Sequence, residues 1–270
     1  MVELSNFNFA LLLTAFAGLS TGIGSLIALY AKRTNTGFLS ISLGFSAGVM
    51  IYVSFVELFS DARKILSADF GGNGEWTATL MFFAGFAVFA LIDKLIPNYE
   101  NPHEMHKVEE MLDAKEADRF KHLHRIGILM VIAIGVHNFP EGIVTFLSSM
   151  ADSKLGIAIA VAVAIHNIPE GIAVSIPIFY ATGSRKKAFV YSFLSGLSEP
   201  AGGILGYFML KPFISDAVIG MTFAGVAGMM VFISFDSLLP SAEKYGKHHL
   251  AILGLVLGMV VMAASLLLSR

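Results

Sequence analysis

Long apolar stretches separated by short polar connections run through the whole sequence. A membrane-spanning helix needs about 20 mainly apolar residues. Stretches of that length recur eight times, at roughly 8–31, 39–60, 76–96, 126–148, 155–179, 188–210, 217–239 and 249–268. The pattern predicts an all-α polytopic membrane protein, with eight transmembrane helices forming a single domain over residues 1–270.

The composition supports a membrane protein and excludes some kinds of site. Only 14% of the residues are charged and mean hydropathy is +0.74, whereas about a quarter of the residues in soluble domains are charged. The lipid bilayer is therefore an expected partner. The net charge of −2 argues against binding to nucleic acid, and the absence of cysteine excludes disulfides and thiolate metal ligands.

The distribution of basic residues predicts the orientation. Thirteen of the 18 Lys and Arg residues lie in the connections that follow the odd-numbered spans. Cytoplasmic connections carry the excess of Lys and Arg, so both termini are expected outside. The long polar connection 97–125 is then a cytoplasmic loop, probed as flexible, and it carries four histidines whose metal role or incidental placement stays open: His103, His106, His122 and His124.

One short motif occurs twice, 29 residues apart, in the fourth and fifth apolar stretches. The copies are His137-Asn138-Phe139-Pro140-Glu141-Gly142 and His166-Asn167-Ile168-Pro169-Glu170-Gly171. A charged side chain at the bilayer centre costs roughly 2.5–3.5 kcal/mol on insertion scales. Two sets of such groups at that depth need a compensating partner, and a divalent metal ion is the partner that these ligand types suit.

Helical geometry gives each motif a ligand face. Residues i and i+4 lie about 40° apart around a helix, so each His shares a face with the Glu of its own motif. The Asn lies about 100° round from the His, and the Glu falls between them. Each carboxylate can serve the His side, serve the Asn side or bridge both. Each proline removes a backbone hydrogen bond, so both helices are expected to kink at the site.

Further polar residues lie at or near the same depth. Glu199 and Met50 are level with the two motifs, Glu199 as a ligand or gate or else a structural acid, and Met50 as a ligand or else plain packing. Ser54, Glu57 and Asp61 follow Met50 along one helical face. These three are interpreted as an acidic entrance, with a solvated helix end as the alternative.

A fainter repeat relates the two ends of the chain. Residues 47–55 in the second stretch resemble residues 227–235 in the seventh, at an offset of 180. The paired stretches are five apart, so the copies have opposite topology, as in the inverted repeats of secondary transporters. Chance similarity between helices rich in small residues is the alternative.

These motifs resemble the ZIP family of divalent metal transporters, and its bacterial ZupT-type branch in particular. The resemblance implies a 3+2+3 arrangement, with spans 1–3 and 6–8 as inverted halves, in a bacterial inner membrane. It also implies an elevator-like sliding of spans 1, 4, 5 and 6 against the others. It implies a binuclear site, with the first metal held by His137, Glu141, His166, Glu170 and Met50, and the second by Asn138, Glu141, Asn167, Glu170 and Glu199.

The leading hypothesis is uptake of a divalent metal into the cytoplasm by alternating access, with no catalytic cofactor. Mixed imidazole, carboxylate and amide ligands suit Zn²⁺, Fe²⁺, Co²⁺ and Mn²⁺, and Cd²⁺ is a further candidate. The alternatives are a membrane-embedded di-metal enzyme and a metal-gated receptor without transport. The order of metal preference, proton coupling, carrier or channel-like permeation and assembly into a homodimer stay open.

Overall fold

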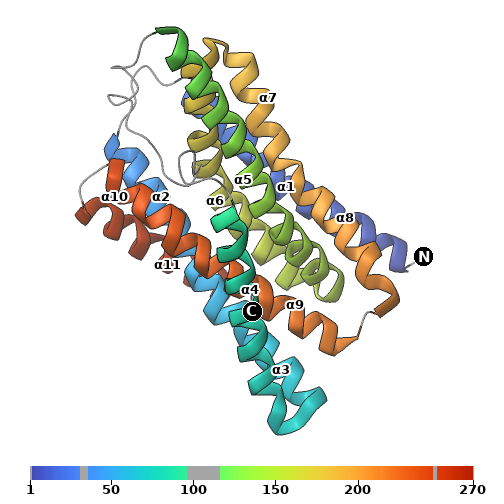
Figure 1. Ribbon diagram of the computed structural model, residues 1–270. Coiled ribbons are helices and arrows are strands. Elements are labelled where there is room, and N and C mark those ends of the chain that lie inside the picture. The colour runs from blue at the N-terminus through green and yellow to red at the C-terminus, as the bar shows by residue number, and fades with distance from the viewer. Residues whose placement is uncertain (1, 31–35, 96–115, 214, 246–247, 270) are drawn as a thin grey trace.

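The structure is a computed structural model that describes residues 2–30, 36–95, 116–213, 215–245 and 248–269 (Figure 1). All regular structure in these ranges is helical. Five helices are uninterrupted: α1 (Val2–Tyr30), α4 (Gly74–Leu95), α5 (Glu116–Ala151), α6 (Ser153–Thr182) and α11 (His248–Ser269).

The remaining helical segments are built from consecutive pieces. The second segment consists of α2 (Thr36–Val53), the π-helical turn η1 (Ser54–Leu58) and α3 (Phe59–Phe70). Two further segments are α7 (Arg185–Gly196) followed by α8 (Ser198–Leu210), and α9 (Asp216–Ile233) followed by the π-helical turn η5 (Ser234–Leu238) and α10 (Leu239–Tyr245). Short 3₁₀ turns lie at η2 (Gly71–Asn73) and η4 (Lys211–Phe213).

Several of these helices are long and apolar enough to cross a membrane. Within the described ranges, five segments meet both conditions: Asn6–Ile27, Ser40–Lys94, Ser153–Ile172, Asp216–Glu243 and His248–Leu267. Large apolar side chains such as Leu12 and Leu267 are 69% and 71% exposed. Exposed apolar surface of this kind is suited to lipid contact, and the prediction of an all-α membrane protein is confirmed at this level.

The histidine-bearing connection is shorter than the sequence indicated. Helix α5 already begins at Glu116, because 116–125 continues the helix that enters the fourth apolar stretch, so His122 and His124 belong to a helix. His103 and His106 lie outside the described residues.

The helices form two groups. Helices α1, α5, α6, α7 and α8 pack against one another and are called here the motif bundle. Helices α2, α3, α4, α9, α10 and α11 form the second group, called here the companion bundle. The two bundles meet where α6 packs on α2 and α11, and where α5 packs on α9 (Figure 1).

Glycines allow backbones to touch at these contacts. A Cβ added at Gly228 of α9 would lie 1.9 Å from the carbonyl oxygen of Phe82 in α4. Such close approach is typical of membrane helices, where packing rather than water exclusion holds helices together. In the motif bundle, Cβ atoms added at Gly18 and Gly196 would lie 2.3 and 2.2 Å from the carbonyl oxygen of the other glycine.

The two π-helical turns lie at matching positions. Ser54–Leu58 and Ser234–Leu238 are separated by 180 residues, the same offset that relates 47–55 to 227–235. In each turn a backbone N–H bonds five residues back, from Phe59 to Ser54 and from Leu239 to Ser234. Since π turns are rare, this coincidence favours a true repeat over chance similarity.

The Gly228 contact predicts a stability change. Gly228→Ala should separate α4 from α9 and lower the free energy of unfolding by about 1–3 kcal/mol, as overpacking does. Gly225→Ala is the control on the same helix, because its added Cβ would lie 3.8 Å from its nearest neighbour, the carbonyl oxygen of Met81. Thermal unfolding in detergent measures both, and equal melting temperatures would contradict the contact.

Candidate metal site

A one-residue connection sets the relative height of the two motifs. Helix α5 ends at Ala151 and α6 begins at Ser153, so Asp152 alone joins them. The Asp152 carboxylate caps α6 by accepting from the N–H groups of Lys154 and Leu155 at 2.7 and 2.9 Å. His137 lies 15 residues before Asp152 and His166 lies 14 residues after it. The two antiparallel helices therefore present the motifs at the same level.

The imidazoles and carboxylates of the two motifs form crossed pairs. His137 Nε2 lies 3.2 Å from Glu170 Oε1, and His166 Nε2 lies 3.2 Å from Glu141 Oε2. Within α5, His137 Nε2 also lies 3.4 Å from Glu141 Oε1. All four residues are at most 5% exposed. The structure thus brings the four predicted residues into one buried cluster.

The spacing of this cluster is close to that of a metal shell. Two ligand atoms on one tetrahedral zinc ion, each at about 2.0–2.2 Å, lie about 3.3–3.5 Å apart. The three N···O distances above are 3.2–3.4 Å. Within the described part of the chain, however, no group of three or more His, Asp and Glu side chains is already arranged around one metal position. Ligation here therefore requires small side-chain rotations from the direct His–Glu contacts.

The carboxylate of Glu170 faces two kinds of partner. Its Oε1 contacts His137. With the Asn138 amide oriented so that its nitrogen donates, that nitrogen lies 3.0 Å from the Ile134 carbonyl and 3.3 Å from Glu170 Oε2. Glu170 therefore joins the His side of the cluster to the Asn side, which is one of the three arrangements that helical geometry left open.

Asn167 and Glu199 form a second polar pair beside the first cluster. The Asn167 amide nitrogen donates to the Ala17 carbonyl at 3.0 Å and also to Glu199 Oε1. Both side chains are fully buried, and Asn167 Oδ1 and Glu199 Oε2 have no hydrogen-bond partner among the described residues. Two buried oxygen acceptors without donors are a costly arrangement that a cation would satisfy.

Proline and glycine place α8 next to the motifs. Pro200 cannot donate to the carbonyl of Gly196, and α7 ends at Gly196 just before α8 begins at Ser198. Glu199 therefore lies in the first turn of α8. A Cβ added at Gly142 would lie 1.9 Å from the Glu199 carbonyl oxygen, so this motif glycine lets α8 approach α5 directly. The motif prolines Pro140 and Pro169 both lie inside continuous helices.

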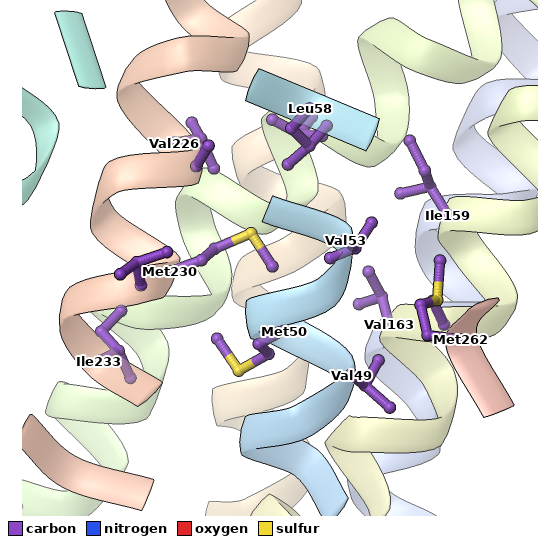
Figure 2. Close-up of a cluster of buried hydrophobic side chains, with 14 of the residues drawn as sticks. Val49, Met50, Val53, Leu58, Ile159, Val163, Val226, Met230, Ile233 and Met262 are labelled. Atoms are coloured by element: carbon purple, nitrogen blue, oxygen red, sulfur yellow. The ribbon is translucent and has the colours of Figure 1, made fainter. Parts of the chain in front are cut away.

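The remaining predicted residues lie away from the His–Glu cluster. Met50 is fully buried in the apolar cluster between α2 and α9, where Figure 2 shows it beside Val49 and Val53. No contact between Met50 and the four motif residues is recorded in the described part of the chain. The side chain of Met50 is placed as plain packing would place it.

The three predicted entrance residues differ from one another. Ser54 and Glu57 lie in the π turn η1 and are buried. Asp61 lies in α3, where its carboxylate accepts from Lys64 Nζ at 2.7 Å. A neighbouring Lys partly neutralises this carboxylate, so Asp61 is a weaker attractor for cations than its sequence position suggested.

A small cavity opens beside the cluster, on the side of the companion bundle. Glu141 and His166 form part of its wall, together with Thr145, which follows Glu141 by one helical turn. Thr145 Oγ1 is buried and has no hydrogen-bond partner among the described residues. From the companion bundle, Val53, Leu58 and Met230 complete the wall. Sequence reasoning did not single out Thr145 or Met230, although the i+4 spacing from Glu141 and the offset of 180 from Met50 would have found them.

Comparisons with known proteins agree with this geometry. The ZIP Zinc transporter family matches residues 94–266. Proteins named zinc transporter ZupT are 58% identical over 275 residues in Nitratidesulfovibrio vulgaris, covering 99% of both chains, and 58% identical over 260 residues in Streptococcus mutans, covering 96% of this chain and 97% of the relative. A third, from Clostridium perfringens, is 55% identical over 278 residues and 98% of both chains.

The family is one of membrane transporters and not of enzymes, which removes the enzyme alternative. With several helices apolar enough to span a bilayer, the chain is a multi-pass membrane protein. A family match over more than half of its length, and relatives this similar over nearly all of it, show that the chain belongs to the ZIP zinc transporter family.

Proposed function

We propose that this protein carries Zn²⁺, and other divalent ions of similar size and ligand preference, across a bacterial inner membrane into the cytoplasm. The observation that carries the proposal is the crossed pairing of two imidazoles and two carboxylates at one level of α5 and α6, all buried. Charged groups inside a membrane mark ion pathways. The names of the relatives support zinc as the cargo, and the ligand set also suits Fe²⁺, Co²⁺, Mn²⁺ and Cd²⁺.

The chain crosses the membrane eight times in this proposal, with both termini outside. The continuity of α2 with α3, of α7 with α8, and of α9 with α10 supports eight crossings rather than the five that length and hydropathy alone select. The excess of Lys and Arg in the connections after odd-numbered spans supports a cytoplasmic start for α5.

The site binds two ions that share carboxylates. His137, His166, Glu141 and Glu170 hold the first ion, and the amides of Asn138 and Asn167 with Glu199 hold the second. The contact of Glu170 with both His137 and Asn138 supports a bridging role for that carboxylate. The unpartnered oxygens of Asn167 and Glu199 support a second cation position.

Transport proceeds by alternating access, with the motif bundle moving against the companion bundle. The division of helices into two groups supports this, because the His–Glu cluster lies on α5 and α6 while the cavity beside it is closed by aliphatic side chains of α2 and η1. In the proposed orientation, Thr145 lies on the outer side of Glu141. An aliphatic wall there obstructs a hydrated ion until the bundles shift, since burying an ion away from polar groups is costly.

Removal of the shared carboxylates should abolish transport. The double substitution Glu141→Gln and Glu170→Gln keeps side-chain size but removes both negative charges, and Zn²⁺ uptake into proteoliposomes should fall at least tenfold, because loss of even an outer-shell partner costs about 10–100-fold in affinity. Glu243→Gln, at a carboxylate of α10 that pairs with the exposed His248, is the control and should keep its uptake. Unchanged uptake by the double variant would end the assignment.

Removal of the second cation position should change the binding stoichiometry. Glu199→Gln should lower the number of Zn²⁺ ions bound at equilibrium from about two to about one per chain, because the bridging carboxylates alone leave the second ion under-coordinated. Isothermal titration calorimetry of the purified protein in detergent measures this number. A stoichiometry that stays at two in the variant would contradict a role for Glu199.

A further inference from the structure

Met230 lies in the wall of the cavity that Glu141 and His166 also line. Its side chain comes from α9 of the companion bundle and is only 3% exposed. Figure 2 shows the Met230 sulfur reaching from α9 towards α2, at about the level of Val53. A sulfur atom therefore lies on the side of the cavity opposite the helices that carry the motifs.

Met230 is also the counterpart of Met50 in the internal repeat. The two residues are 180 positions apart, the offset that relates 47–55 to 227–235 and η1 to η5. In Figure 2 the Met50 side chain extends from α2 towards α9, and the Met230 side chain extends from α9 towards α2. The repeat therefore supplies one thioether from each half of the chain to the contact between these two helices.

The chemistry of the cavity wall makes the sulfur distinctive. Its polar members, Glu141, His166 and Thr145, all belong to the motif bundle. The members from the companion bundle are Val53, Leu58 and Met230, and among these three only Met230 has an electron-pair donor in its side chain. A thioether is a neutral, polarizable donor that prefers soft metal ions to hard ones.

We propose that Met230 Sδ is a specificity-determining ligand for the transported ion, donated by the companion bundle while Glu141 and His166 hold the ion from the motif bundle. This inference rests on the proposed transport of divalent metals. The thioether favours Cd²⁺ and Zn²⁺ over Mn²⁺ as the ion passes the cavity. Because the sulfur and the motif residues belong to different bundles, the contact exists only in the arrangement that brings α9 against α5 and α6.

Selectivity separates this role from packing. Met230→Leu conserves volume and apolar character, a kind of exchange that cores tolerate well, but removes the sulfur. Proteoliposome uptake and equilibrium binding of Cd²⁺, Zn²⁺ and Mn²⁺ are measured for the wild type and the variant. The Cd²⁺-to-Mn²⁺ ratio should fall several-fold in Met230→Leu. Met229→Leu, the half-buried neighbour on the same helix, is the matched control and should leave the ratio unchanged.

A second variant keeps the test decisive. Met230→Gln has similar length and replaces the sulfur by a hard oxygen donor, so its ratio should move towards Mn²⁺ even if the Leu variant is poorly folded. An equal loss for all three ions, or no change in ratio, would overturn the assignment of Met230. Absence of any metal uptake by the wild type would instead overturn the proposed function, and the binding ratios would still decide whether Met230 contributes a ligand.

Discussion

The structure depends on the burial of opposite charges at one level between two helices. His137 and Glu170, and His166 and Glu141, lie within 3.2 Å of each other and out of contact with water. Breaking such a pair leaves a charge without a partner in a medium that does not solvate it, which costs far more than the pair itself contributes. The surrounding helices must therefore keep α5 and α6 in register whether or not an ion is present.

Small residues provide that register. The motif glycines Gly142 and Gly171 place the backbones of α8 and α1 against α5 and α6, since their added Cβ atoms would each lie 1.9 Å from a carbonyl oxygen. The partners are Glu199 in one case and Thr21 in the other. Each motif thus ends in a residue that fixes a neighbouring helix, so the phrase that supplies ligands also supplies the packing that positions them.

The sequence predicted the motif cluster well because the rules involved are local. An i,i+4 pair on a helix has one geometry, and the 29-residue separation matches two helices that meet at a single-residue connection. The cavity wall was harder to predict, because Met230 reaches it only through the tertiary contact of α9 with the motif bundle. Asp61 was overestimated as an attractor because its pairing with Lys64 depends on side-chain rotamers, and the π turns have no sequence signature as strong as proline or glycine.

The one-residue junction at Asp152 has a mechanical consequence. With its carboxylate occupied by two backbone N–H groups of α6, the junction leaves almost no slack for α5 and α6 to slide along each other. Both halves of the ligand set must then travel as a unit, so the ion keeps its donors from the motif bundle throughout the cycle. Only the groups facing it from across the gap are exchanged, and these decide which ions pass easily and which are retained.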